Sequence, residues 1–309
     1  MENYIEFKIV YNKEYSNSET EPLGEKFINN NKESYSLEKT KTIGGDYGYR
    51  CKDDGLYEVT LKERKDKMIT DLSYMFCDCE SLISVSVSVF NTKKIINMKC
   101  MFYGCKSLRS VDLTNINTEN VINMQYMFYR CKSLTSLNLK SFNTKNVTSM
   151  YEMFFGCSSL KNINLSSFNT EKITDMNSMF FNCSSLTTLN LSSFNVENVN
   201  DFFGMFDGCC SLKSLTFNNY KTQNAIIMSR MFSNCSSLTT INLSSFNTQN
   251  VIDMEDMFNG CSSLTTLDLS SFDINKAKID GMFSGCRNLL SCGTSDKKIE
   301  DEFKKCKKA

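Results

Sequence analysis

The sequence contains no histidine, no tryptophan and only one proline, Pro22. Histidine is the commonest general base and the commonest metal ligand, so its absence excludes every Ser-His and Cys-His nucleophilic arrangement. Lysine and carboxylate chemistry remains, but no convergent set of catalytic groups is visible. We therefore expect a protein that is not an enzyme, that has no cofactor and no metal, and for which no small-molecule substrate is evident.

Net charge and long apolar runs are missing as well. The 309 residues carry 35 basic and 35 acidic side chains, which gives no global attraction to nucleic acid or to an anionic membrane. No run approaches the roughly 20 apolar residues of a membrane-spanning helix, and the N-terminal "MENYIEFKIV" lacks the features of a signal peptide. We expect no nucleic-acid binding, no membrane span and a cytoplasmic location, with the cell surface as the alternative.

What the chain has in abundance is an internal repeat. A Met-Phe pair recurs nine times, every 26 residues except for a final step of 25. The pair begins at Met75, Met101, Met127, Met153, Met179, Met205, Met231, Met257 and Met282. A period of this length is typical of solenoids, in which each repeat forms one coil that stacks on its neighbours.

One part of each repeat has the pattern of a β-strand. The end of the L-x-x-L-x-L segment, as in Leu264, Leu267 and Leu269, alternates apolar and polar residues. Such alternation predicts a short strand with one buried face. One strand per repeat, always in the same direction, predicts a parallel sheet along the solenoid.

The Met-Phe part of the repeat has a different spacing. Its apolar residues, for example Met150, Met153, Phe154 and Cys157, are separated by 3, 1 and 3 positions, which predicts one face of a short helix. An Asp, Asn or Ser before this face in most repeats suits an N-cap. A Gly, Asn or Asp before the repeated cysteine suits the left-handed end of a helix.

The expected fold is an α/β repeat, a right-handed leucine-rich-repeat solenoid with one parallel strand and one short helix per 26-residue coil. Its eight to nine repeats occupy residues 68–290. In residues 1–67 the strings "YIEFKIVY" and "GLYEVTLKE" predict a small β-rich capping domain or a separate recognition module. In residues 291–309 the spacing of Ile299, Phe303 and Cys306 predicts a capping helix.

A cysteine lies four residues after the methionine of every Met-Phe pair, which gives nine repeated cysteines. Zinc sites need thiolates that converge, often as C-x-x-C pairs, whereas these cysteines form a line. Disulfides between neighbouring coils fit the distance, but the total of 15 cysteines is odd. We favour buried free thiols over both alternatives, because Cys is among the most buried residue types and free thiols suit a reducing compartment.

Two surfaces are candidates for binding a partner. The first is the outward face of the strands, with Asp112, Asn138, Asn164, Asn190, Asn242 and Asp268 in one column and Ser136, Thr188, Thr240 and Thr266 beside it. It is either a solvated sheet or a binding face. The second is the residue after Met-Phe, which is aromatic in four successive repeats, at Tyr103, Tyr129, Phe155 and Phe181. These rings either pack against a flanking helix or offer an apolar surface to a partner.

The block "VTSMYEMFFGCSSLKNINLSSFNT" resembles the repeat of BspA-like leucine-rich-repeat proteins, many of which are surface proteins of bacteria and protists. The resemblance covers about residues 68–290 and implies adhesion or protein binding, often at a surface. We therefore expect a non-catalytic macromolecular binding scaffold whose partner is a protein. A cell-surface adhesin exported without a visible signal, or a structural component of a larger assembly, is the alternative.

Overall fold

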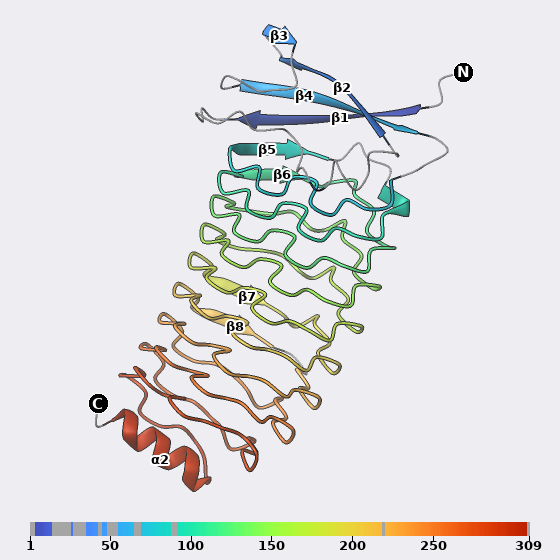
Figure 1. Ribbon diagram of the computed structural model, residues 1–309. Helices are drawn as coiled ribbons and strands as arrows, with labels where there is room; N and C mark the ends of the chain where they lie inside the picture. Colours follow the sequence, from blue (N-terminus) through green and yellow to red (C-terminus); the bar gives the residue numbers. More distant parts are fainter. Residues whose placement is uncertain are drawn as a thin grey trace.

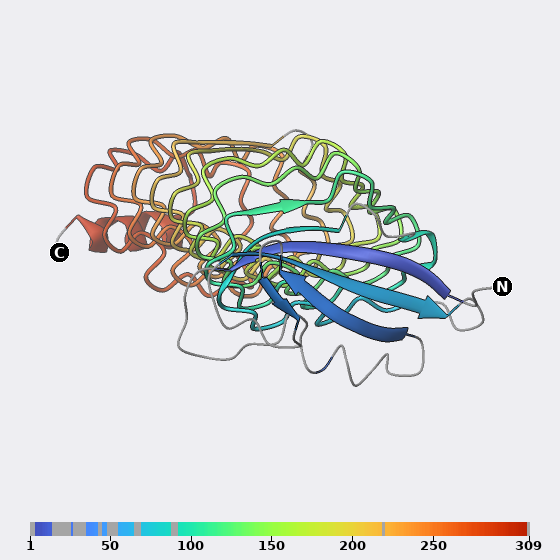
Figure 2. The same ribbon diagram turned by 90° about the horizontal axis from the view of Figure 1, so that it is seen from above.

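The computed structural model describes residues 4–13, 26, 35–42, 45–47, 55–64, 69–87, 92–217 and 220–307. The molecule is an elongated stack of coils, with β-strands at the N-terminal end and one helix at the C-terminal end (Figure 1). Seen along the stack, successive coils follow one another around a shared interior (Figure 2). The repeat region therefore has the solenoid form that the 26-residue period predicts, while its right-handed sense stays a prediction.

The N-terminal strands continue into the coils through backbone hydrogen bonds. They are β1 (Tyr4–Lys13), β2 (Tyr35–Thr42), β3 (Gly45–Tyr47) and β4 (Gly55–Arg64), all antiparallel. The strands predicted in "YIEFKIVY" and "GLYEVTLKE" are thus observed as β1 and β4. Strand β1 also pairs with β5 (Leu82–Ser86) of the first coil. The sheet order is β3-β2-β4-β1-β5-β6, and the domain boundary at residues 67 and 68 stays a prediction.

Parallel pairing between coils is confirmed, although the strands are short. Strand β5 pairs with β6 (Ser110–Asp112), and β7 (Thr188–Asn190) pairs with β8 (Ser214–Thr216). Elsewhere single parallel bridges join the coils in register, one of them between Asn97 and Asn123. This register places equivalent residues of successive repeats side by side. Each position of the repeat therefore forms a line of residues along the stack, which we call a column.

The prediction of one short helix per coil is wrong. In the described coils the Met-Phe segment is a chain of turns. Tyr126 and Arg130 have positive φ angles of 59° and 57°, which an α-helix does not allow. The N–H of Met127 closes a turn to the carbonyl of Met124 (3.3 Å), whereas the N–H of Phe128 donates to Met153 in the next coil (2.9 Å). A turn that repeats every four residues spaces its apolar side chains much as a helix does.

The residues predicted to cap these helices have related roles in the turns. The side chain of Asn123 accepts a hydrogen bond from the N–H of Gln125 at 3.0 Å, which is an Asx turn. The predicted left-handed positions are left-handed, with φ angles of 72° at Gly104 and 56° at Asn182. The sequence therefore predicts the correct positions for these backbone features, although they belong to turns and not to a helix.

The core is built from columns of identical side chains. Rings of the Met-Phe phenylalanines stack along the axis, as Phe102 does on Phe128 with 5.3 Å between centroids. A buried threonine column joins the coils at the corner after the strand. The Thr144 hydroxyl donates to the carbonyl of Asn169 (2.7 Å) and accepts from its N–H (2.8 Å). The sequence does not distinguish this column as buried, because threonine is also common in exposed turns.

The repeated cysteines are buried, as predicted, and the 14 described cysteines are unbridged. Each thiol from the second coil onward lies against the previous coil, where the Sγ of Cys157 donates to the carbonyl of Phe128 at 3.1 Å. Burial raises the pKa of Cys157 well above its ordinary value. The thiols of this column from the second coil onward therefore stay protonated and serve to pack the coils together.

Helix α2 (Lys297–Cys306) covers the last coil. Ile299 is fully buried, and the ring of Phe303 meets Phe283 edge-on at 6.0 Å between centroids. Glu302 accepts a hydrogen bond from the N–H of Gly281 at 2.9 Å. The apolar spacing that predicted this helix therefore corresponds to its contact with the solenoid.

Candidate functional site

The four aromatic residues predicted as a binding surface form a continuous row of stacked rings. The centroids of Tyr103 and Tyr129 are 4.5 Å apart, those of Tyr129 and Phe155 are 4.7 Å apart, and those of Phe155 and Phe181 are 4.6 Å apart. All four side chains are partly exposed. Because the rings cover one another's faces, the row presents ring edges to solvent.

Two further tyrosines widen this row. Tyr126 lies edge-on to Tyr129 at 5.8 Å and to Tyr151 at 5.1 Å between centroids. Burial raises the pKa of Tyr103 and Tyr126, and burial together with the Glu152 carboxylate raises that of Tyr151. The phenols therefore stay protonated at neutral pH and can donate hydrogen bonds. We define the aromatic stripe as Tyr103, Tyr126, Tyr129, Tyr151, Phe155 and Phe181.

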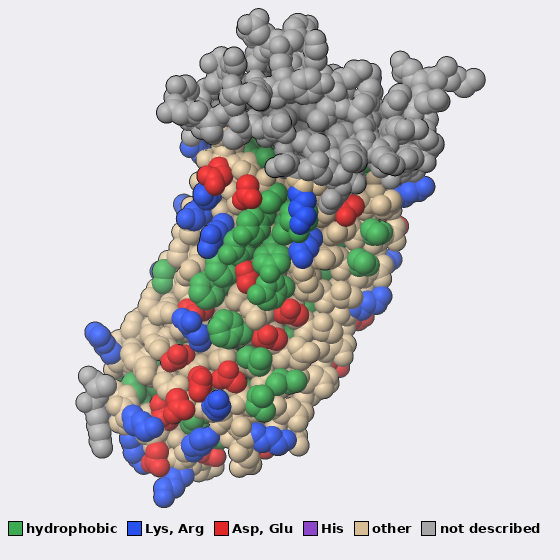
Figure 3. Space-filling model, in the orientation of Figure 1, with side chains coloured by type: hydrophobic (Ala, Val, Ile, Leu, Met, Phe, Trp, Pro, Cys, Tyr) green, Lys and Arg blue, Asp and Glu red, His purple; other side chains and the backbone are tan. Residues whose placement is uncertain are grey.

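Charged side chains of both signs lie beside the aromatic stripe. The Nζ of Lys99 is 5.7 Å from the ring centroid of Tyr126, and the Cζ of Arg130 is 5.1 Å from that of Tyr129, both within cation–π range. Burial raises the pKa of the half-buried Glu152 carboxyl. Figure 3 shows an apolar band on this side of the stack with acidic and basic groups around it.

A buried polar cluster marks the C-terminal limit of the aromatic stripe. In the next coil Asp207 takes the position of the ring and is buried. Its carboxylate is 3.0 Å from Nη2 of Arg230 and accepts from Nδ2 of Asn234 at 2.9 Å. Burial raises the pKa of Asp207, and the contacts with Asn234 and Arg230 oppose that rise. The sequence shows the loss of the ring here but not the ion pair that replaces it.

The polar residues predicted on the strand face are all exposed. The side-chain oxygens of one column hold the turn after the strand, as Asn164 does by accepting from the N–H of Ser166 at 3.0 Å. The same contact occurs at Asp112, Asn138, Asn190, Asn242 and Asp268. The neighbouring Ser136, Thr188, Thr240 and Thr266 project outward. These hydrogen bonds to the backbone explain why Asn and Asp recur in this column, so their recurrence does not indicate a ligand-binding site.

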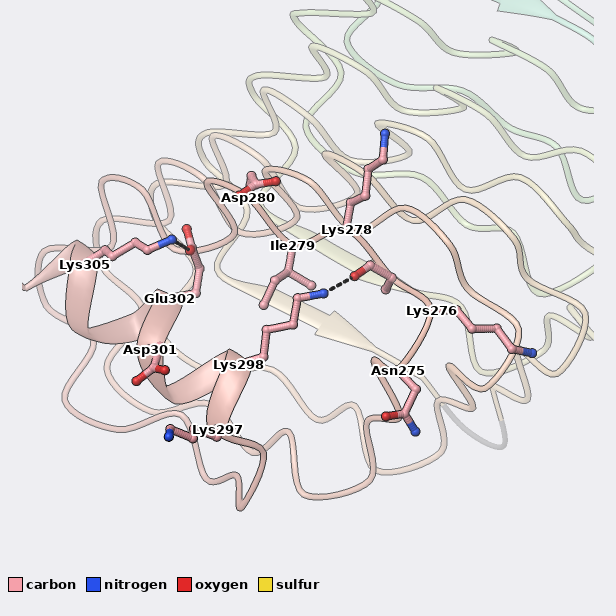
Figure 4. A pocket seen from close by; sticks show the side chains of 11 residues that line it. Asn275, Lys276, Lys278, Ile279, Asp280, Lys297, Lys298, Asp301, Glu302 and Lys305 are labelled. Carbon is pink, nitrogen blue, oxygen red and sulfur yellow. Dashed lines mark hydrogen bonds and ion pairs between the residues drawn. The ribbon is translucent and has the colours of Figure 1, made fainter.

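A hollow of about 640 Å³ lies between the last coil and α2 (Figure 4). Lys298 donates from Nζ to the carbonyl of Ala277 at 2.5 Å, and Lys305 donates to Glu302 at 2.7 Å. The Lys298 contact joins the helix to the last coil, whereas the Lys305–Glu302 pair lies within the helix. The hollow is therefore the junction between the helix and the coil that it covers. In the described part of the chain no group of three or more Cys, Asp or Glu side chains is arranged for a metal ion, and no helix there is long and apolar enough to cross a membrane.

The repeat region matches a known family model three times in succession. The matches cover residues 56–162, 135–239 and 211–306, and the family is described as "Mycoplasma protein of unknown function, DUF285". The chain belongs to the DUF285 family. The DUF285 matches overlap and together run from β4 to the end of α2.

Solved structures of two bacterial proteins are similar to this DUF285 chain. A leucine-rich repeat protein from Bacteroides ovatus is 17% identical, with a TM-score of 0.29, over 83% of this chain and 92% of its own. A leucine rich cell surface protein from Faecalibacterium prausnitzii is 15% identical, with a TM-score of 0.24, over 71% of this chain and 85% of its own. Such TM-scores do not establish a common fold. No curated protein matches significantly, and none of these matches names a catalytic activity.

Proposed function

We propose that this DUF285 protein is a non-catalytic scaffold that binds another protein through the aromatic stripe. The observation that carries the proposal is the restriction of the rings to four successive coils. The next coils have Asp207, Ser233 and Asn259 at the same position and keep the same backbone hydrogen bonds. Since the fold does not require a ring there, the rings are available for another role.

The geometry of the aromatic stripe favours a protein partner. Partly exposed tyrosines combine apolar area with a hydroxyl donor, and such residues are enriched among interface hot spots. Because the rings are already stacked on the solenoid, binding orders few side chains. A planar ligand that stacks on ring faces finds no free face within the row.

The cellular location of this binding is a separate proposal. The column of buried free thiols suits a reducing compartment and supports the cytoplasm. The resemblance to BspA-like repeats supports the alternative, an adhesin at the cell surface. Protease treatment of intact cells separates the two, because only a surface protein is cleaved. Sedimentation of a lysate tests the remaining alternative, a component of a larger insoluble assembly.

Affinity capture with matched variants tests the aromatic stripe. Tyr129→Ser with Phe155→Ser interrupts the stripe, and Thr188→Arg with Thr240→Arg adds bulk to the strand face as the control. We expect a protein that is retained by the unmodified chain and by the strand-face variant and lost with the stripe variant. Loss with the strand-face variant alone would move the site to that face, and equal retention by all three chains would overturn the proposal.

Thermal unfolding separates binding from packing. The stripe variant is expected to lose about 1–2 kcal/mol of unfolding free energy, because exposed ring pairs contribute little each. The fully buried Phe128 provides the reference, and Phe128→Ala is expected to cost about 3–5 kcal/mol. If the stripe variant is destabilised as much as Phe128→Ala, the rings belong to the core and the proposed function fails.

A further inference from the structure

Two cysteines outside the repeated cysteine column lie at ring positions of the aromatic stripe. Four stripe rings belong to the column after the Met-Phe pair, whereas Tyr126 belongs to the column before it. In the first of these columns Cys77 precedes Tyr103 by one coil, and in the second Cys100 precedes Tyr126 by one coil. Neither column has another cysteine. Two thiols therefore replace rings at the N-terminal end of the stripe, in adjacent coils.

Backbone hydrogen bonds hold the segments that carry these two cysteines against each other. The N–H of Phe76 donates to the carbonyl of Met101 at 2.8 Å, across the step from the first coil to the second. The N–H of Cys77 closes a turn to the carbonyl of Tyr74 at 3.0 Å. Cys100 is the residue of the second coil that is equivalent to Tyr74. Cys77 is therefore separated from Cys100 by the width of one turn and one step between coils.

The rings one coil further on show how small this separation is. Tyr103 and Tyr126 are the equivalent pair, and their ring centroids are 6.3 Å apart. Tyr126 and Tyr129 span the same turn within one coil, and their centroids are 5.8 Å apart. Because the two distances nearly agree, the step between coils adds little to the width of the turn. The ends of such a turn lie less than about 7 Å apart, which approaches the roughly 4.4–6.8 Å between the Cα atoms of a disulfide.

The two thiols differ in their exposure to solvent. Cys77 is half-buried, whereas Cys100 is only 5% exposed. Burial raises the pKa of Cys77 to about 12, and Asp78 and Cys100 add to this rise. Burial also raises the pKa of Cys100 to about 11, although Lys99 and the Tyr74 hydroxyl oppose the rise. A dissolved oxidant therefore reaches Cys77 first, and Cys100 is placed to react in a second step.

We propose that Cys77 and Cys100 are an oxidisable thiol pair that closes a disulfide between the first two coils, with a small-molecule disulfide such as oxidised glutathione as the oxidant. The Cys77 thiolate attacks one sulfur of the oxidant, whose S–S bond breaks, and one glutathione leaves as a thiolate. The Cys100 thiolate then attacks the Cys77 sulfur and releases the second glutathione. The protons of the two cysteines pass through solvent to the two glutathione thiolates. Two protein thiols are oxidised, and one glutathione disulfide is reduced to two thiols.

The disulfide would add a covalent link between coils that the described structure joins without one. A disulfide stabilises a protein mainly by restricting its unfolded chain, so the oxidised protein should melt at a higher temperature than the reduced protein. The link would also fix the N-terminal end of the aromatic stripe, beside Tyr103. The proposal rests on the two thiols and does not depend on the proposed function.

Peptide mapping of the full-length chain tests the pair. The native protein is incubated with oxidised glutathione, its remaining thiols are alkylated, and the chain is cleaved before Asp78 and after Lys99. These cuts place Cys77, Cys79 and Cys100 on separate peptides. We expect a linked pair of peptides that contains Cys77 and Cys100 and that dithiothreitol separates. Cys100→Ser should abolish the link and leave glutathione attached to Cys77.

Thermal unfolding with matched variants provides a second measurement. Oxidation should raise the melting temperature of the unmodified chain by several degrees. Cys210→Ser removes an exposed thiol outside the two columns and should keep both the link and the shift, whereas Cys77→Ser should lose both. A link from Cys77 to Cys79 or Cys105, or a link that forms only after unfolding, would overturn the proposal. So would glutathione that stays on Cys77 of the unmodified chain.

Discussion

The repeated cysteine both fills space and donates a hydrogen bond. The carbonyl of Phe128 accepts from the N–H of Cys131 and from the thiol of Cys157, each at 3.1 Å. An alanine would leave a gap and remove the second donor. A valine would be larger and would also lack the donor. The same arrangement recurs from coil to coil, which explains why one small side chain is kept at this position.

Thiol reactivity in the native protein should follow burial. Cys210 is exposed, whereas Cys157 and Cys183 are buried and their thiol pKa values are raised well above the ordinary value. Because alkylating agents attack the thiolate, we expect Cys210 to be modified rapidly and the column only on unfolding. Peptide mapping by mass spectrometry measures both rates. Equal rates for Cys210 and Cys157 would contradict the buried column.

The carboxyl of Asp175 should make stability depend on pH. Burial and the nearby Asp201 raise its pKa above the ordinary 3.8, although the N–H of Asn177 opposes the rise. A raised folded pKa favours the folded state at low pH, and this contribution is lost as the pH rises through it. Asp175→Asn should therefore add a few tenths of a kcal/mol at neutral pH, since solvent screens this half-exposed group. The gain should vanish below pH 3.8.

Denaturant unfolding at both pH values measures the effect of Asp175→Asn. Asp268→Asn is the matched control with the opposite sign, because the N–H of Ser270 lowers the pKa of Asp268. A lowered folded pKa contributes stability above the unfolded pKa, and this is lost as the pH falls. The control should thus destabilise the protein at neutral pH. The same sign of change in both variants would show that burial does not control Asp175.

The element that replaces the predicted helix joins the coils to one another. In a helix each N–H bonds within its own segment. In the Met-Phe segment alternate N–H groups cross to the next coil, as from Tyr126 to Tyr151 and from Arg130 to Phe155. Together with the threonine column, these bonds make each coil depend on its neighbours. The stability of each Met-Phe segment therefore depends on both of the coils that its hydrogen bonds join.

Thr144→Val tests the threonine column. Valine has nearly the same shape but leaves the N–H and the carbonyl of Asn169 without their partner. We expect a loss of about 2–3 kcal/mol in the free energy of unfolding, because buried polar groups without a partner are costly. Thr148→Val is the control, since Thr148 is exposed and its hydroxyl makes only a long contact of 3.4 Å. Equal losses would show that the buried hydrogen bonds contribute little.

The sequence predicted burial better than conformation. The spacing of Met150, Met153 and Phe154 identified the buried face, and all three are buried. It did not identify the turns, because a four-residue turn repeat and a helix give similar apolar spacing. The aromatic stripe was visible because it departs from the repeat. The pairing of Asp207 with Arg230 was not visible, since it joins two columns that vary from coil to coil.

At the scale of the whole molecule, the coils are protected at both ends of the stack. Strand β1 adds to the first coil through β5, and α2 covers the last coil with Ile299 and Phe303. A terminal coil without such cover would expose apolar side chains to water. The two covers differ in kind, a sheet extension at one end and a helix across the coil at the other.

Ile299→Asp tests the helical cover. The change puts a carboxylate at a fully buried position and is expected to cost about 3 kcal/mol or more. Lys297→Ala, at an exposed residue of the same helix, should have little effect on the melting temperature. Hydrogen exchange should rise first near Phe283 and only later near Phe154, because each coil contacts only its neighbours. Uniform exchange along the stack would mean that α2 does not protect the last coil.

The backbone hydrogen bonds of the Met-Phe segments all point one way along the stack. Phe128 donates to Met153, and Phe154 donates to Met179, so the last coil has donors left over, one of which Glu302 accepts from Gly281. A whole coil could be inserted or deleted in the middle without changing what either end presents. During evolution the chain is thus free to lengthen or shorten by 26 residues at a time, whereas the last coil and α2 must be inherited together.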